Sequence, residues 1–441
     1  MVHSTSIFWF RRDLRLADNA GLYHALRSGQ KIIPLFIFDS TILNKLENKK
    51  DLRVQFIHQE ISKLSQELKA LGSGLMVKYG EPKKIIQEIL AQVNIQDIFC
   101  NKDYEPNAIK RDQAIQEIIA LTGGKFHSFK DQSIFEQDEI TKDDGKPYTI
   151  FTPYSKKWKA KLQSNIKEGT SYFLTAYSST KYQQNFIKEF RFEPIPSLQE
   201  MGFGPSDFNY PKKEVESSVI KNYTQNRNFP AIKGTSQLGM HFRFGTISIR
   251  DKARKAAALN ETFLNELIWR DFYMQILWHF PQVEQHAFKA KYERINWRNN
   301  EEEFKKWCEG KTGYPIVDAG MRELNITGFM HNRVRMIVAS FLTKHLLVDW
   351  RWGEAYFAEK LLDFDLSANN GGWQWAAGCG TDAAPYFRVF NPMLQTEKFD
   401  KQFQYIKKWV PEIGSDLYPK PMVDHTFARN RCLETYKKGL D

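Results

Sequence analysis

The chain has 441 residues, with 63 Lys and Arg against 52 Asp and Glu, so its formal net charge at pH 7 is +11. This length exceeds one ordinary domain, so we expect two domains. The excess of basic side chains favours a polyanionic partner. The four cysteines, Cys100, Cys308, Cys379 and Cys432, form no CxxC pair. Their spacing argues against a disulfide framework and a cysteine-based zinc site, so no metal is expected and a reducing compartment fits best.

The N-terminus leads from Met1 directly into a strand-like segment, without a basic leader, a small-residue cleavage site or a long apolar run. We therefore expect a soluble protein of the bacterial cytoplasm or nucleoid, without a membrane segment. Aromatic residues make up 14% of the chain, which is more than a core of this size usually needs. Some rings are expected to contact planar ligands or bases.

Residues 1–130 are predicted to form an α/β domain with a doubly wound, parallel, five-stranded sheet. Short apolar runs alternate there with amphipathic stretches at helical period. The runs are IFWF, KIIPLFIFD, GLMVKYG, DIFCN and GKFHSF, and the helical stretches are 17–28, 51–71, 82–93 and 108–121. No GxGxxG follows the first strand, so a conventional NAD site is not expected.

The rest of the chain is predicted to contain a long connector and an all-α domain. Residues 131–205 are polar and rich in Lys, Gln and Ser, which indicates an interdomain connector. Residues 206–441 read as helical, with the clearest periodicity at 261–277, 301–309, 316–324, 331–347 and 352–361.

Four segments of the helical region carry candidate chemistry. In GTSQLGMHFRFG, Thr235 and Ser236 are expected where a helix begins, and could hold a pyrophosphate there. Ordinary helix capping is the simpler alternative for these two hydroxyls. In ELIWRDFY, Glu266, Trp269 and Tyr273 share a helix face, which suits a pocket for a stacked base. A core tryptophan beside a solvated carboxylate is the competing interpretation.

In MHNRVRMIVASFL, Asn332 and Met336 lie one turn apart, with Arg333 and Arg335 beside them. These arginines could clamp phosphates or pair with carboxylates, whereas Met336 alone would be ordinary core filling. Residues 361–392 contain two Asp, adjacent Asn, paired Gly and Trp-x-Trp. This stretch looks too polar and turn-rich for a simple core helix, and we expect a planar, hydrogen-bonding group to dock against it.

Five blocks of the sequence resemble the photolyase/cryptochrome family over essentially the whole chain. In chain order they are FWFRRDLRLADN, GTSQL, ELIWRDFY, GKTGYPIVDAGMRELNITGFMHNRVRMIVASFL and LSANNGGWQWAAGCGTDAAPYFRVFNP. The resemblance implies an N-terminal α/β domain, a connector and a helical domain that binds FAD in a bent form. It also implies a light-driven enzyme, most similar to the class I type of cyclobutane pyrimidine dimer (CPD) photolyase, acting on UV-damaged DNA as a monomer.

The resemblance assigns a set of residues to FAD. These are Tyr223, Thr235, Ser236, Gln237, Leu238, Gly239, Phe263, Arg270, Arg335, Asp363, Asp365 and Asn369. Arg335 would pair with Asp363 beside the isoalloxazine, and Asn369 would lie against the reactive flavin nitrogen. Gln237 and Gly239 stand where the family pattern usually carries Arg and Ser, so this chain departs from the family at one phosphate contact.

The resemblance also assigns a lesion site. Glu266 would stabilise the dimer radical anion, Trp269 and Trp375 would flank the dimer, and Arg227 and Arg333 would hold phosphates, with Tyr273 nearby. Asn332 and Met336 are the combination found in CPD photolyases. The (6-4) photolyases carry His at both positions. Members of the family that sense blue light, the cryptochromes, are a further alternative, although Glu266, Asn332 and Met336 together favour repair.

Two further features follow from the resemblance. Trp297, Trp350 and Trp373 match the tryptophan chain that carries electrons to a photo-oxidised flavin, although ordinary packing would explain any one of them alone. Ala108 stands where folate-binding members carry Glu, which weakens a folate assignment. A folate, a deazaflavin, a second flavin or no antenna all stay open.

Overall fold

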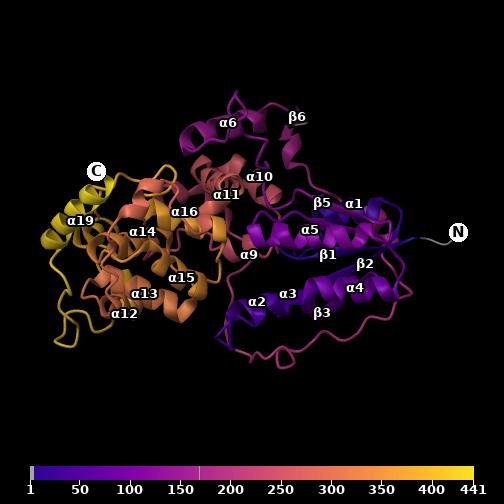
Figure 1. The fold of residues 1–441 in the computed structure, drawn as a ribbon, viewed down its shortest axis with the longest axis horizontal. Helices are drawn as coiled ribbons and strands as arrows, with labels where there is room; N and C mark the ends of the chain where they lie inside the picture. Colours follow the sequence, from indigo (N-terminus) through magenta and orange to yellow (C-terminus); the bar gives the residue numbers. More distant parts are fainter. Residues whose placement is uncertain (1–3, 168) are drawn as a thin grey trace. The chain divides into compact units, whose positions relative to one another are not determined.

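The computed structural model of the chain describes residues 4–167 and 169–441. These residues form two compact units, each assembled from separate stretches of the chain (Figure 1). The first comprises Met1–Glu136, Ala160–Glu214 and Gln237–Lys255, and the second comprises Gln137–Lys159, Val215–Ser236 and Ala256–Asp441. The sequence prediction used continuous segments, 1–130, 131–205 and 206–441, and these boundaries stay a prediction. The expected connector contributes residues to both units.

The first unit contains a parallel five-stranded sheet in the order β3-β2-β1-β4-β5. Its strands are β1 (Thr5–Phe10), β2 (Lys31–Asp39), β3 (Met76–Gly80), β4 (Ile95–Asn101) and β5 (Lys125–Phe129). Phe8 in the central strand pairs with Pro34 of β2 and with Phe99 of β4. Each strand overlaps a predicted apolar run, and β1 and β4 begin two residues before theirs. A sheet covered on both faces favours such apolar strands.

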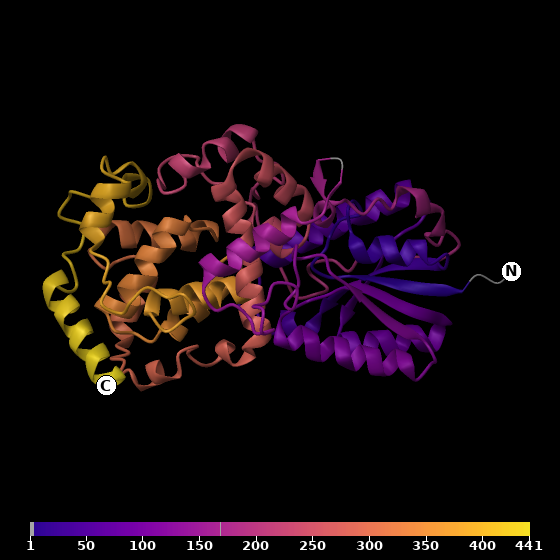
Figure 2. The same cartoon turned by 90° about the horizontal axis from the view of Figure 1, so that it is seen from above.

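Helices cover both faces of this sheet (Figure 2). On one face, α1 (Ala20–Arg27) and α3 (Leu52–Ala70) pack Leu22 and Ile61 against Phe8. On the other face, α4 (Pro82–Gln92) and α5 (Pro106–Ala120) pack their isoleucines with Ile7 and Trp9. The short α2 (Ser40–Leu43) follows β2. The doubly wound α/β fold predicted from the sequence is thereby confirmed.

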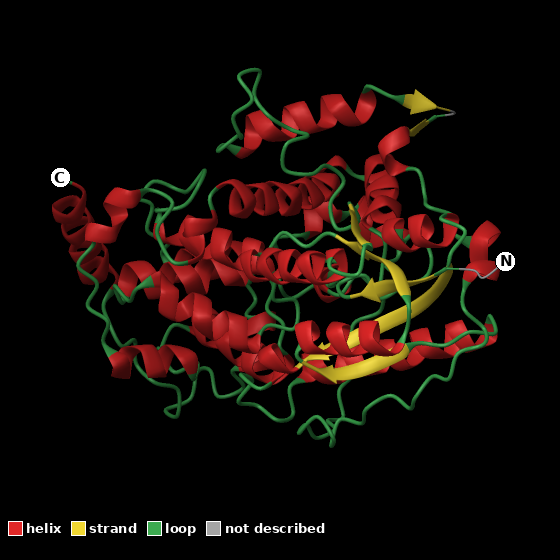
Figure 3. Cartoon of the chain, turned by 45° about the vertical axis from the view of Figure 1, so that its right-hand side comes forward, coloured by secondary structure: helices red, strands yellow, loops and turns green. Residues whose placement is uncertain are grey.

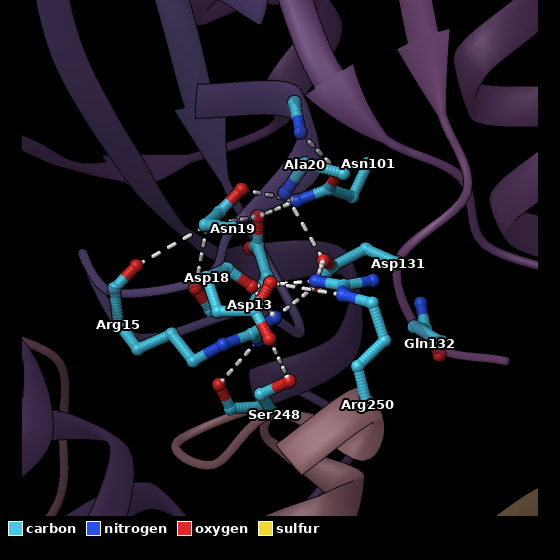
Figure 4. Close-up of polar contacts among 12 residues, drawn as sticks. Asp13, Arg15, Asp18, Asn19, Ala20, Asn101, Asp131, Gln132, Ser248 and Arg250 are labelled. Carbon is cyan, nitrogen blue, oxygen red and sulfur yellow. Dashed lines mark hydrogen bonds and ion pairs between the residues drawn. The ribbon is translucent and has the colours of Figure 1, made fainter. Parts of the chain in front are cut away.

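The strand order reverses at β1, so the carboxyl ends of β1 and β4 border the position where doubly wound sheets commonly bind ligands. Buried polar side chains of the chain itself occupy this position (Figure 4). The amide of Asn101 donates hydrogen bonds to Asp13 at 2.6 Å and to Asn19 at 2.7 Å. Its oxygen accepts from the backbone N–H of Gly21 at 2.8 Å. Burial raises the pKa of Asp13.

Two ion pairs extend this network through Arg250, which lies on α10 (Ile249–Leu259). Its guanidinium contacts Asp18 at 2.9 Å and Asp131 at 2.7 Å, and Arg15 contacts the other oxygen of Asp131 at 2.7 Å. Burial alone would raise the pKa of Asp131, but the two arginines outweigh burial and lower it. The network ties β1 and β4 to segments distant in the sequence.

The second unit is helical (Figure 3). Its principal helices are α11 (Glu261–His279), α12 (Glu301–Cys308), α13 (Pro315–Thr327), α14 (Asn332–Ser340), α15 (Trp350–Lys360), α16 (Leu366–Ala377), α17 (Pro392–Phe399), α18 (Gln404–Trp409) and α19 (His425–Leu440). Shorter elements are α7 (Ser217–Lys221), α8 (Tyr223–Asn226) and the 3-10 turns Pro281–Glu284 and Ala290–Arg294. Its main core surrounds Trp307, Trp350 and Trp373, each at most 2% exposed.

Three predictions about local structure differ from what is observed. The stretch 331–347 is helical from Asn332 to His345, but α14 changes to π-helical hydrogen bonding at Phe341–His345. The polar segment 131–205 contains α6 (Phe151–Gln163), the paired antiparallel strands β6 (Ile166–Lys167) and β7 (Thr170–Ser171), and two 3-10 turns, Tyr172–Leu174 and Thr180–Asn185. The stretch judged too turn-rich for a core helix contains α16, which begins at its N-cap Asp365.

None of the helices in the described part of the chain is both long and apolar enough to cross a membrane.

Candidate functional site

The candidate site centres on α11, whose first turn is capped by Asn260 through a 3.0 Å bond from the Phe263 N–H. The helix brings Trp269 and Tyr273 together, with ring centroids 5.4 Å apart, as their spacing of four residues predicts. Phe263 is buried on the same helix. Two members of the predicted face of α11, Trp269 and Tyr273, therefore lie side by side.

Phe151, which the sequence analysis missed, covers one face of Trp269. The two rings are parallel, with centroids 3.7 Å apart and planes inclined by 4°. Phe151 opens α6, and its backbone N–H donates to Asp382 at 3.3 Å. No local pattern marks Phe151, because its partner comes from a distant segment. Trp269 consequently has one ring face occupied before any ligand arrives.

Glu266 is held by an ion pair with Arg227, which lies just after α8. Both side chains are about one-third exposed, at 35% and 36%. Burial raises the pKa of Glu266, and the pairing with Arg227 opposes this change. Tyr223 packs edge-on against Phe263 at 5.1 Å, so the predicted residues of α8 and α11 meet.

A second group of predicted residues lies on α14. Asn332 is exposed at its start, and Arg333 donates to the sulfur of Met336 at 3.5 Å and to Asn228 at 2.7 Å. Burial, Arg227 and Arg388 all lower the pKa of Arg333. Asn332, Arg333 and Met336 are thus neighbours, as predicted.

Arg388 was not predicted, although it lies within the recognised block ending in FRVFNP. Like Arg227, it lies close enough to Arg333 for charge repulsion to lower the pKa of the Arg333 guanidinium. Beside it, Phe387 is 61% exposed. Clustered arginines next to an exposed ring are suited to a polyanionic ligand that carries planar bases.

Arg335 and Asp363 form the ion pair that the sequence analysis expected. One guanidinium nitrogen of Arg335 contacts both carboxylate oxygens of Asp363, at 2.9 and 3.1 Å, and Nε donates to the Met330 carbonyl at 2.7 Å. Asp365, two residues later, caps α16 and accepts from the Ser367 hydroxyl at 2.6 Å. Asp363 and Asp365 therefore both lie immediately before the first turn of α16.

Asn369 on α16 is oriented by Glu354 on α15. Its amide nitrogen donates to the Glu354 backbone carbonyl at 3.1 Å and to the carboxyl Oε1 at 3.2 Å. Burial raises the pKa of Glu354 to about 7; the bond from Asn369 opposes the change and Glu284 adds to it. Glu354 was not predicted, although it adjoins the glycine at which α15 approaches α16. With its nitrogen engaged, Asn369 presents its oxygen as the remaining acceptor.

The predicted phosphate segment differs from expectation. No helix begins at Thr235 or Ser236; α9 (Gly239–Arg243) begins after the N-cap Leu238, which makes no side-chain capping bond. Gln237 adopts a positive φ of 52°, so the backbone turns sharply there. The division between the two units falls between Ser236 and Gln237. Thr235 and Ser236 therefore belong to the helical unit, whereas Gln237, Leu238 and Gly239 belong to the α/β unit.

Trp373 and Trp350 are buried in the core of the helical unit, and Trp297 packs against that core while partly exposed. Trp373 lies against the backbone of α15 at Gly353, where a Cβ atom would come within 2.1 Å of the indole. Trp375 and Arg270 are partly exposed on α16 and α11. The structure thus places every predicted residue, while their roles stay predictions.

Comparison with known proteins identifies the family. Residues 6–171 match the family described as DNA photolyase, and residues 263–416 match the FAD binding domain of DNA photolyase. A deoxyribodipyrimidine photo-lyase of Synechococcus sp. is 35% identical, covering 98% of this chain and 96% of its own. The chain belongs to the DNA photolyase family. Its helical unit carries the FAD-binding domain of that family.

Solved structures agree in fold with this photolyase family member. A bacterial class III photolyase from Agrobacterium tumefaciens superposes with a TM-score of 0.85 at 31% identity, covering 100% of this chain and 98% of that one. An archaeal photolyase from Sulfolobus tokodaii, determined with two FAD molecules, gives a TM-score of 0.80 at 34% identity, covering 98% of this chain and 100% of that one. The predicted combination of α/β and helical FAD-binding domains is confirmed.

The residues present fit a flavin. An isoalloxazine needs an acceptor or donor at its reactive nitrogen and polar groups along its edge. Asn369, fixed through its nitrogen by Glu354, offers an oxygen, and the Arg335–Asp363 pair offers both donors and acceptors. These groups come from α14 and α16 and the turn that precedes α16.

Proposed function

We propose that the chain is a deoxyribodipyrimidine photo-lyase, which uses light to split cyclobutane pyrimidine dimers in UV-damaged DNA. Support comes from relatives of that name that match it over nearly its full length, as the Synechococcus enzyme does. One observation carries the proposal. Glu266, which lies on the same helix as Trp269, is paired with Arg227 from the end of α8. A carboxyl group beside a stacking ring suits the two adjacent, linked bases of a dimer extruded from the duplex.

When bound, reduced FAD would supply the photoexcited electron that opens the cyclobutane ring. The protein needs no nucleophile or metal for this reaction. Arg335 and Asp363 would hold the flavin edge, Asp365 its ribose side, and Asn369 its reactive nitrogen. Glu354 fixes the orientation of the Asn369 amide, so the acceptor oxygen is placed before the cofactor binds.

On the lesion side, Glu266 would hydrogen-bond the dimer. Burial raises its pKa against the opposing effect of Arg227, and a carboxyl group that takes up a proton can donate a hydrogen bond to a negatively charged dimer. The face of Trp269 not covered by Phe151 would stack on one base, and Trp375 would flank the other. Such stacking contributes about 1–3 kcal/mol per base.

Positive charge would orient the DNA strand. Arg227 and Arg388 each repel Arg333, as the lowered pKa of Arg333 indicates. Backbone phosphates would reduce this repulsion. Their binding is therefore favoured by the loss of repulsion between the arginines as well as by the release of counterions. Asn332 and Met336 beside Arg333 would contact the dimer and define the preference for CPD lesions.

Trp297, Trp350 and Trp373 would form the electron chain that restores reduced FAD after oxidation. Trp373 would be the donor next to the flavin. A Trp373→Phe variant is expected to lose photoreduction of oxidised FAD. Unchanged photoreduction in this variant would contradict the assignment.

A second chromophore is also proposed, because the Sulfolobus tokodaii photolyase was solved with two FAD molecules. It would be a folate, a deazaflavin or a flavin. The buried network around Asp13 and Asn101 occupies the end of β1 and β4. An antenna would therefore bind elsewhere. Mass spectrometry of the chromophores released from the purified protein would show which second chromophore is bound. We further propose a monomer that works in the cytoplasm, where the DNA lies.

Repair of a CPD-containing oligonucleotide under blue or near-UV light tests the function. Purified protein with reduced FAD is expected to remove the dimers, and no loss of dimers would favour a cryptochrome-type sensor. Competing (6-4) lesions and single-stranded substrates in the same assay test the choice of lesion and strand. A Glu266→Ala variant should retain FAD but repair fewer dimers per absorbed photon, whereas Glu266→Gln keeps a donor and should lose less.

A further inference from the structure

The two residues that follow α8 connect a predicted lesion contact with a predicted phosphate contact. Arg227 forms an ion pair with Glu266 of α11, and its guanidinium lies over the Tyr223 ring, 5.9 Å from the centroid. The side-chain oxygen of Asn228 accepts a hydrogen bond from Arg333 of α14 at 2.7 Å. One short segment therefore touches both the carboxyl group proposed to meet the dimer and an arginine proposed to meet the DNA backbone.

Arg227 has two anionic partners to choose between once DNA is present. In the free protein its partner is Glu266, and each side chain of the pair is partly exposed, so DNA can reach it. Burial lowers the pKa of Arg333, and Arg227 lies close enough to lower it further by charge repulsion. A phosphate held by Arg333 is therefore also attracted by Arg227. Because a guanidinium binds phosphate and carboxylate groups in the same way, the phosphate and Glu266 compete for Arg227.

We infer that Arg227 couples binding of the DNA backbone to recognition of the lesion, by leaving Glu266 for a phosphate so that Glu266 takes up a proton and donates a hydrogen bond to a carbonyl oxygen of the dimer. This inference rests on the proposed function, since it requires an extruded dimer beside Glu266. The phosphate replaces the carboxylate as the counter-ion of Arg227, and the proton comes from solvent and stays on Glu266. Arg227 acts on the dimer through Glu266 and is in this respect a positioning residue.

The groups around Glu266 favour uptake of a proton after Arg227 has moved. Burial raises the pKa of Glu266, and Arg227 is the cation that opposes this change, so its departure raises the pKa further. Burial and the Glu266 carboxylate both raise the pKa of Tyr223 on α8 and of Tyr273 on α11, so these phenols stay neutral. Arg270 lies one turn after Glu266 on α11 and is assigned to FAD by the family resemblance. The complex should therefore bind more protons than the free protein, and affinity should fall as pH rises.

Calorimetric titration of the FAD-loaded protein with a CPD-containing oligonucleotide in the dark tests the proton uptake. Binding enthalpies measured in two buffers of different ionisation enthalpy give the number of protons taken up. The wild type is expected to take up a proton on binding, and its affinity should fall by up to about tenfold per pH unit as pH rises. Glu266→Gln should lose this uptake and the pH dependence that goes with it. Glu261→Gln, at an exposed carboxylate on the same helix that pairs with Lys159, is the matched control and should keep both.

Undamaged duplex of the same sequence gives a second, independent readout. It supplies phosphates but no dimer, so in the wild type Glu266 competes with them for Arg227. Glu266→Gln removes the competing carboxylate and is expected to bind undamaged DNA about two- to fivefold more tightly, as loss of an exposed ion pair would allow.

The two readouts separate failure of the exchange from failure of the proposed function. Arg227→Ala should take up less proton than the wild type on binding the dimer, because its free state already lacks the opposing charge, whereas Arg227→Lys should restore the uptake. Equal uptake by the wild type and Glu266→Gln, or unchanged binding of undamaged DNA by Glu266→Gln, would overturn the exchange and leave the photo-lyase assignment standing. A wild type that does not prefer dimer-containing DNA would overturn both.

Discussion

The side-chain amide of Asn369 donates two hydrogen bonds to Glu354, one to the backbone carbonyl at 3.1 Å and one to the carboxyl group at 3.2 Å. The backbone bond does not depend on the charge of Glu354, whereas the carboxyl bond does. The amide of Asn369 is therefore positioned by the fold and adjusted by one titratable group. This arrangement links protonation of Glu354 to the residue proposed to contact the flavin.

Replacing Glu354 with Gln is expected to change the pH dependence of stability. The pKa of Glu354 rises from 4.5 to about 7 on folding, so the folded state binds more protons between these values. The wild-type free energy of unfolding should consequently lose a contribution of at most roughly 3 kcal/mol as pH rises from about 4.5 through 7. Urea unfolding of both proteins at pH 5 and pH 8 measures this. A difference between them that does not change with pH would contradict the prediction.

Truncating Phe151 should weaken lesion binding. In Phe151→Ala, Trp269 loses the ring stacked on it at 3.7 Å and gains rotational freedom. Affinity for dimer-containing DNA should fall by about 1 kcal/mol, the usual contribution of an aromatic pair. Phe427→Ala, at a ring that is 59% exposed, controls for loss of an aromatic side chain. Equal affinities for the two variants in a titration would rule out a positioning role for Phe151.

Two glycines in neighbouring helices should respond in opposite ways to alanine. A Cβ at Gly353 would lie 2.1 Å from the Trp373 ring, whereas a Cβ at Gly372 would meet nothing within 4 Å. Gly353→Ala is expected to destabilise the protein by about 1–3 kcal/mol through overpacking. Gly372→Ala should stabilise it by up to about 1 kcal/mol, because alanine favours the helix. Thermal unfolding of the two variants decides, and stabilisation by both would show that Trp373 can move aside.

His345 should make the helical unit sensitive to acid. It is 0% exposed, and its Nε2 contacts Nδ1 of His425 at 2.8 Å. Burial, His425 and Arg431 lower its pKa from 6.5 to about 3, while Asp424 acts on His425 in the opposite direction. The unfolded state therefore binds more protons between pH 6.5 and 3, and the free energy of unfolding should fall as pH drops through this window.

A His345→Gln variant tests this origin of the acid sensitivity. Its free energy of unfolding should fall less steeply between pH 6.5 and 4 than that of the wild type. The slopes are compared, because the substitution also changes packing. Parallel slopes would assign the acid sensitivity to other groups.

The sheet and most helices could be predicted because their signals are local. Each strand overlaps a predicted apolar run, and α11 and α12 begin at Glu261 and Glu301, where the predicted periodicity begins. The residues Arg335 and Asp363 were paired correctly, but through family resemblance and not through spacing. Their contact joins α14 to the turn before α16, which periodicity alone does not predict.

The errors have tertiary causes. The two glycines of α16 suggested a turn, yet a Cβ at Gly371 would lie 2.2 Å from the Tyr273 ring, so this glycine serves close helix packing. Phe151 was not predicted because it matters through its stacking on Trp269, which comes from a distant part of the sequence. Glu354 reads as an ordinary polar position on an amphipathic helix, and only the approach of Asn369 distinguishes it.

Residues Gln137–Lys159 belong to the helical unit, although the stretches before and after them in the sequence belong to the α/β unit. A recombinant fragment beginning at residue 206 would contain all the principal helices but not Phe151 or Trp158. Trp269 would then expose a ring face that is now covered, and the buried indole bond from Trp158 to Asp271, 3.1 Å long, would be lost. A shortened protein that keeps only the helical unit should therefore include residues Gln137–Lys159, either joined to it through a linker or added as a separate peptide.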